Sequence, residues 1–297
     1  MGRDLAYLGI GLHEEALGHY DAALSHYQRA AAGYHETGNI RGWGAATTRI
    51  GAIFHHRGDF TTALPYTEEV VRCGLEAADR QVSAWGLLWR ATVKWRIGPV
   101  GEAIGDLEKA IDLFNGIPDH VGSAWANSIL GGCYLRQGDF TRALPILEDA
   151  IRSITEKRLK GLLITSVPLI LAETYVLIAE KAVGPRRTHM IRTATRACRA
   201  AMKQSKAHRY WLPMAFRLRG TMEWLSGKRG AAQRSWRAST VAAEEMGELY
   251  EVGLTLLESG HRTQKRADLE RAEAIFIEVG TTLDALEARR ILSTHPA

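Results

Sequence analysis

The sequence predicts an all-α protein, a right-handed superhelical solenoid of about seven antiparallel helix hairpins ending in a capping helix. Three observations predict this fold class. A glycine recurs every 40 residues, an aromatic-and-alanine pattern follows each of these glycines, and alternating β-branched runs typical of strands are missing. With 46% hydrophobic and 24% charged residues, the composition is that of a globular chain.

The repeat is marked by Gly18, Gly58, Gly98 and Gly138, which are each 40 residues apart. An apolar residue lies two positions after each glycine, and an alanine lies five positions after it. Glycine can adopt positive φ and end one helix, and an aspartate after it can cap the next helix. The alanine leaves room for two helices to approach closely, so each repeat is expected to be a helical hairpin.

These residues resemble the tetratricopeptide repeat family, with L-G-x-x-Y followed by G-x-[YF]-x-x-A-x-x-x-[YF]-x-x-A. The resemblance is clear over residues 4–157, less regular over 158–280, and followed by an expected capping helix at 282–293. We expect one solenoid domain over residues 1–297. The period of 40 exceeds the usual length of about 34 residues, and looks like the long-period arrays attached to signalling ATPases and bacterial class III nucleotide cyclases. HEAT-type repeats share the period but lack this signature.

The resemblance implies a binding scaffold whose first helices face a concave groove. Trp85, Trp89 and Arg96 follow a helical spacing and share one stripe of the third hairpin. Moving by 40 residues in either direction gives the matching positions of the neighbouring hairpins. The candidate groove residues are Arg49, His56, Trp85, Trp89, Arg96, Trp125 and Arg136.

A second interpretation of this stripe places its tryptophans in the core. In the same register, Arg90 and Lys94 occupy positions where the earlier hairpins are expected to bury apolar residues such as Ile10. Two arrangements satisfy this pattern. In the first case, the aliphatic parts of the Arg90 and Lys94 side chains lie along the surface and their charged groups reach solvent. In the second case, the third hairpin is rotated and buries Trp85, Trp89 and Trp95 instead.

A strongly basic segment interrupts an otherwise acidic chain. Residues 181–237 contain 15 Lys or Arg and one acid, Glu223, whereas the whole chain has a net charge of +5. A solvated helix face is one explanation, and a negatively charged partner is the other. The candidate docking residues, four of them at helical spacing, are Arg186, Arg187, Arg192, Arg196, Arg199 and Lys203.

No catalytic or cofactor motif accompanies these surfaces. The three cysteines fit no C-x-x-C spacing, and Gly227-Lys228 lacks the other residues of a phosphate-binding loop. His55 and His56 are adjacent, so their side chains diverge by about 100° in a helix; we expect them at a partly exposed helix end. We therefore expect neither an enzyme nor a bound metal or cofactor.

The sequence thus favours a non-catalytic protein–protein interaction scaffold, a regulatory or docking module of a cytoplasmic signalling assembly. Its partner would be a protein or peptide with an acidic surface. The alternative is a nucleic-acid-associated scaffold that uses residues 181–237. No charge-free run is long enough to span a membrane. The apolar opening helix predicts contact of the first hairpin with an upstream domain or a second copy.

Overall fold

The computed structural model describes residues 2–98, 100–161 and 163–294. Within these ranges the chain forms 15 α-helices and two short 3-10 helices and contains no strand, which confirms the predicted fold class. The elements are α1 (Gly2–Leu17), α2 (Tyr20–Glu36), α3 (Ile40–Arg57), α4 (Phe60–Glu76), α5 (Arg80–Ile97), α6 (Val100–Asn115), α7 (His120–Arg136), α8 (Phe140–Glu156), η1 (Leu163–Thr165), α9 (Ser166–Lys181), α10 (Gly184–Ser205), η2 (Arg209–Trp211), α11 (Leu212–Leu225), α12 (Arg229–Met246), α13 (Leu249–Thr263), α14 (Arg266–Glu278) and α15 (Thr282–Thr294).

Consecutive helices pair into seven hairpins, from α1/α2 to α13/α14, and α15 packs against α14. The turn chemistry agrees with the repeat. All four repeated glycines have a positive φ, from 70° to 83°. Asp59 then accepts a hydrogen bond from the backbone N–H of Thr62 at 3.0 Å, and Asp139 accepts one from Arg142 at 3.0 Å. Each aspartate therefore caps the second helix of its hairpin.

The repeated alanines lie at close helix contacts, as their recurrence predicted. Ala63 and Ala143 are both fully buried. We expect Ala63→Leu and Ala143→Leu each to lower the free energy of unfolding by about 1–3 kcal/mol, because the added methylenes and methyls have no free space. Urea denaturation followed by circular dichroism measures this. Midpoints equal to that of the wild type would contradict the packing assignment.

Arg90 and Lys94 form ion pairs within the third hairpin. Arg90 donates two hydrogen bonds to the buried carboxylate of Asp106 on α6, at 2.7 and 2.8 Å. Lys94 Nζ lies 2.9 Å from a carboxylate oxygen of Glu102 and 3.5 Å from one of Asp106. A salt bridge between α5 and α6 thus occupies the position at which the second hairpin buries Ile50, and the repeat keeps its register.

One helix owes its apolar composition to burial. Among the described residues, the segment Leu163–Lys181 is long and apolar enough to cross a membrane by length and composition alone, but 61% of its most apolar stretch is buried. Its helix, α9, packs against α7, α8, α10 and α11. The position of α9 between these helices accounts for its composition.

The first hairpin leaves part of its apolar surface uncovered. Leu5 and Ile10 are 63% and 43% exposed, so the expectation that Ile10 is buried is corrected. Gly11 takes the packing position instead, because its Cα lies against the ring of Tyr27, where an added Cβ would approach a ring carbon to 2.5 Å. Contact of this hairpin with an upstream domain or a second copy stays a prediction.

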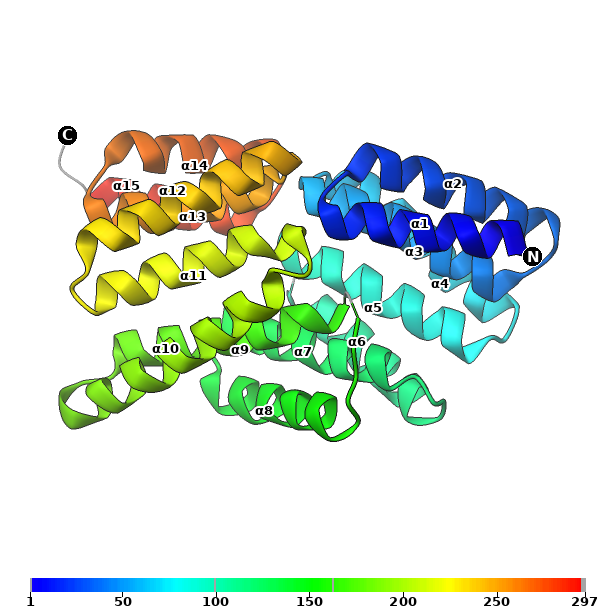
Figure 1. The fold of residues 1–297 in the computed structure, drawn as a ribbon, viewed down its shortest axis with the longest axis horizontal. Coiled ribbons are helices and arrows are strands. Elements are labelled where there is room, and N and C mark those ends of the chain that lie inside the picture. The colour runs from blue at the N-terminus through cyan, green and yellow to red at the C-terminus, as the bar shows by residue number, and fades with distance from the viewer. Residues whose placement is uncertain (1, 99, 162, 295–297) are drawn as a thin grey trace.

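The superhelix closes on itself at one edge. In Figure 1 the C-terminal helices α12–α15 lie beside the N-terminal hairpins after the chain has passed through α5–α11. The hydroxyl of Tyr20 donates a hydrogen bond to the buried carboxylate of Glu248. The rings of Phe60 and Tyr250 meet edge to face, with centroids 5.5 Å apart. The last hairpin therefore covers one end of the concave surface formed by the first helices.

Candidate functional site

The concave surface contains a cavity of about 270 Å³ between α1, α3, α5, α7 and η1. We call it the tryptophan pocket; Arg49, Trp85, Trp89 and Trp125 line it, and all four are predicted groove residues. The rings of Trp89 and Trp125 meet edge to face, with centroids 4.6 Å apart. Trp85 Nε1 donates to a carboxylate oxygen of Asp119 at 2.8 Å, and Asp119 also caps α7. The structure thus brings these three tryptophans together as rigid walls.

Arg49 is neutralised within the fold. Its side chain is 7% exposed, and Nε donates to Glu15 at 3.0 Å while Nη2 contacts the second carboxylate oxygen. Tyr27 also donates to Glu15, at 2.5 Å. Burial lowers the pKa of Arg49 to about 10, and its guanidinium lies 5.1 Å from the Trp89 ring centroid. The charge of Arg49 therefore stabilises the contact between α1 and α3, and the rest of its side chain forms part of the pocket wall.

His56 lies deeper, at the covered end of the concave surface. Its side chain is 10% exposed, Nε2 lies 3.3 Å from a carboxylate oxygen of Glu15, and its ring centroid lies 4.6 Å from that of Tyr210. Burial, with the positive charges of Arg49 and Arg96, lowers its pKa to about 3. His56 is therefore neutral at physiological pH. The expectation of a partly exposed helix end is corrected, because the C-terminal half of the chain covers it.

Arg96 and Arg136 hold the C-terminal hairpins in place. The Arg96 guanidinium lies 5.1 Å from the ring centroid of Tyr250 on α13. Arg136 Nη2 lies 3.0 Å from Asp284 on α15, and Tyr250 donates to the same carboxylate oxygen. Together with His56, these residues contact the returning hairpins rather than an open groove, which corrects their expected role.

The predicted docking residues form an exposed basic surface on α10. We call it the α10 basic face. The remaining side of the helix buries small residues such as Ala194, Cys198 and Ala201. Arg192, Arg196, Arg199 and Lys203 follow a helical spacing, so they point away from that buried side. No ion pair joins any member to the described part of the chain. Its members are Arg186, Arg187, Arg192, Arg196, Arg199 and Lys203.

Other cations of the basic segment are structural. Arg217 is buried, and its guanidinium lies 3.0 Å from a carboxylate oxygen of Glu173 and 3.6 Å from one of Glu251. Arg209 lies 3.3 Å from Glu245. Ion pairs of this kind therefore offset part of the excess charge of residues 181–237, and six of its cations lie on α10.

Comparison with protein families supports the assignment of the repeat. Residues 82–156 match the tetratricopeptide repeat family. This segment of the chain carries tetratricopeptide repeats. None of the curated proteins compared with the sequence matches it.

Two solved structures share the fold over nearly the whole chain. A Rap protein complexed with Competence and Sporulation Factor has a TM-score of 0.67 at 13% identity, covering 98% of this chain and 76% of that one. The apo form of RapI has a TM-score of 0.59 at 12% identity, covering 98% of both chains. At these identities the likeness shows the fold alone.

Sequence reasoning missed several residues of the concave surface. Leu8 and Leu12 line the tryptophan pocket, and Glu15 pairs with Arg49. The sequence did contain a pattern that indicates these three residues, because they follow an i, i+4, i+7 spacing on α1 and so share one face. Asp119 carried no comparable signal, because its contact with Trp85 spans 34 positions.

Proposed function

We propose that this protein is a non-catalytic protein–protein interaction scaffold, a docking or regulatory module of a cytoplasmic signalling assembly. The observation that carries the proposal is the α10 basic face, whose six exposed cations have no ion-pair partner in the described part of the chain. Such a surface attracts a negatively charged partner over a Debye length of about 8–10 Å and accelerates its association. A protein or peptide with an acidic surface fits this charge.

The tryptophan pocket supplies a second, apolar contact. Trp85 is half-buried, and Trp89 and Trp125 are 4% and 3% exposed, so these residues form a rigid apolar wall of the pocket and expose little area themselves. Aromatic side chains are frequent anchors at protein interfaces. The structurally similar Rap protein was solved in complex with Competence and Sporulation Factor, which supports the binding of a ligand by a fold of this shape. We infer that an apolar side chain of a bound segment enters this pocket.

The basic face can be tested by charge reversal. We expect the triple variant Arg192→Glu, Arg196→Glu and Arg199→Glu to bind labelled poly-glutamate at least about tenfold more weakly at low salt. The melting temperature should change little, because these side chains are exposed and surface substitutions cost within about 0.5 kcal/mol each. Fluorescence anisotropy and thermal denaturation measure the two quantities.

The control for this experiment changes the net charge equally at other sites. Arg29, Lys109 and Arg152 are exposed on α2, α6 and α8, and the triple change of these residues to Glu should reduce binding much less. Equal weakening by both variants would mean that net charge alone, rather than α10, attracts the probe. A large drop in melting temperature for the α10 variant would show a structural role.

Binding of a nucleic acid is the alternative for the same surface. Nucleic-acid affinity falls steeply with salt, with a slope set by the number of phosphates contacted. Two of the segment's aromatic residues, Tyr210 and Trp236, are buried and are not presented for base stacking, and Trp211 and Trp224 are half-buried. This burial favours a protein partner. Titration of salt against single-stranded RNA and poly-glutamate separates the alternatives: stronger, α10-dependent binding of RNA would overturn the choice of a protein partner.

A further inference from the structure

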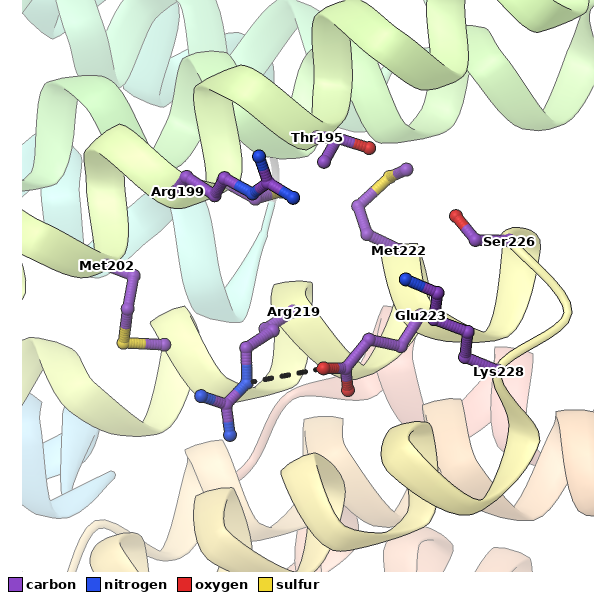
Figure 2. A pocket seen from close by; sticks show the side chains of 9 residues that line it. Thr195, Arg199, Met202, Arg219, Met222, Glu223, Ser226 and Lys228 are labelled. Atoms are coloured by element: carbon purple, nitrogen blue, oxygen red, sulfur yellow. Dashed lines mark ion pairs between the residues drawn. The ribbon is translucent and has the colours of Figure 1, made fainter.

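A second cavity adjoins the α10 basic face. It has a volume of about 330 Å³ and lies between α10, α11 and the turn from α11 to α12. Arg199 belongs both to the basic face and to the wall of this cavity. In Figure 2 the Arg199 guanidinium extends from α10 into the space above α11, and the side chain of Lys228 enters from the α11–α12 turn. We call this cavity the α10–α11 pocket.

The charges that line the α10–α11 pocket are unbalanced. Arg199, Arg219 and Lys228 contribute three cations, and Glu223 is the one carboxylate among the described lining residues. Glu223 is already engaged, because it accepts a hydrogen bond from Ser235 at 2.5 Å and lies 3.9 Å from Arg219 Nε. Within the described chain, neither Arg199 nor Lys228 forms an ion pair. Two cations on opposite walls are therefore free to pair with carboxylates from outside.

The floor of the α10–α11 pocket is apolar. Cys198 and Met222 are 6% and 4% exposed, and the half-buried Met202 also lines the pocket. Burial raises the pKa of the Cys198 thiol to about 12, so this sulfur carries no charge at physiological pH. Methionine side chains are flexible and polarisable, and they adapt to apolar groups of different shape. A floor of this kind suits an aliphatic or aromatic side chain and offers nothing to an inorganic anion.

We propose that the α10–α11 pocket holds one apolar side chain of an acidic protein segment, whose flanking carboxylates pair with Arg199 and Lys228. This inference rests on the proposed function and names the chemistry of the partner at the same surface. The stripe from Arg192 to Lys203 is about 17 Å long at 1.5 Å per helical residue, which matches about five residues of extended chain. The partner segment is thus a short run of Asp and Glu interrupted by Leu, Met or Phe.

Three fluorescent peptides of equal length test this inference on the full chain. The first is acidic with one central Leu, the second has Ser in place of that Leu, and the third has Lys in place of the acids. Burial of a leucine side chain strengthens binding by about tenfold or more, so the first peptide should bind at least about tenfold more tightly than the second. The third should not bind measurably, because its charges repel those of α10.

A variant of the protein in which a larger side chain fills the α10–α11 pocket complements the peptide experiment. Thr195 lines the α10–α11 pocket, and Thr195→Phe should reduce the affinity for the Leu peptide to that for the Ser peptide while leaving the Ser peptide unchanged. Thr193 is equally half-buried on α10 but does not line the pocket. Two residues along a helix turn a side chain by about 200°, so Thr193→Phe is the control and should preserve the preference for Leu.

A second variant tests the role of Lys228, the cation on the wall opposite Arg199, with a substitution that should not disturb the fold. Lys228 is exposed and occupies the N-cap position of α12, where serine is a favoured residue. Lys228→Ser should therefore fold normally, and it should weaken both acidic peptides severalfold. Unchanged binding of both would overturn the pairing of Lys228 with a carboxylate.

The outcomes separate this inference from the proposed function. Equal binding of the Leu and Ser peptides, with no effect of Thr195→Phe, overturns the pocket and leaves the acidic docking surface standing. Failure of both acidic peptides to bind overturns the docking surface as well. Preference for Leu that is lost in Thr195→Phe and kept in Thr193→Phe supports the inference.

Discussion

Replacement of Glu15 with alanine is expected to lower the free energy of unfolding by about 3–5 kcal/mol, because it leaves a buried charge without its partner. Glu15 is 0% exposed and Arg49 is 6% exposed, and Glu15 accepts one hydrogen bond from Arg49 Nε and one from the Tyr27 hydroxyl. After the substitution, the Arg49 guanidinium must remain desolvated and unpaired or pull α3 away from α1. Either response disrupts the wall of the tryptophan pocket.

Urea denaturation followed by circular dichroism measures this effect, and the neighbouring acid provides the control. Glu14 is half-buried and pairs with exposed His19, so Glu14→Ala should cost less than about 1 kcal/mol. The double variant Glu15→Leu with Arg49→Met removes both charges and should recover much of the loss. If Glu15→Ala were no more destabilising than Glu14→Ala, the buried ion pair would not be a major contact between α1 and α3.

Gly86→Ala is expected to destabilise the chain by about 1–3 kcal/mol, through overpacking at the contact between α4 and α5. A Cβ at Gly86 would lie 2.6 Å from the backbone nitrogen and 2.9 Å from the Cα of Val71. Because these are backbone atoms, no side-chain rotation relieves the overlap, and the two helices must separate.

Gly105→Ala is the matched control substitution, and we expect it to raise the free energy of unfolding rather than lower it. Gly105 lies within α6, and no atom outside its own helix lies within 4 Å of the position of its Cβ. Alanine there should stabilise the helix by about 0.5–1 kcal/mol, because glycine loses more backbone entropy on folding. The two midpoints of denaturation should therefore move in opposite directions. A stabilising effect of Gly86→Ala would contradict the close approach of α4 and α5.

The repeat spacing was sufficient to predict the hairpins because its information is local. A glycine with positive φ, a capping aspartate and an alanine at a helix contact act within one hairpin, and Gly58, Asp59 and Ala63 behave as expected. The orientation of the α10 residues was predictable for the same reason. Helical periodicity places Arg192, Arg196 and Arg199 opposite the buried small residues of that helix.

Ion pairs in which one helix neutralises a buried charge of another were harder to predict from the sequence. Arg90 conflicted with the repeat when α5 was considered alone, and the conflict disappears because Asp106 on α6 accepts two hydrogen bonds from its guanidinium. Arg49 is similar, because Glu15 on α1 neutralises it. In both cases periodicity identified the face that carries the charge, but the partner lies on another helix.

The sequence by itself determined the seven hairpins and the direction in which the basic stripe faces, but it left open whether the tryptophan stripe faces the groove or the core. Only the tertiary structure decided which part of the concave surface stays open. The contacts that close it join residues far apart in the chain, 148 positions for Arg136 with Asp284 and 228 for Tyr20 with Glu248. A small rotation between successive repeats accumulates along a solenoid. Its sum over seven hairpins brings the last one onto the first, and no spacing within a single repeat specifies that sum.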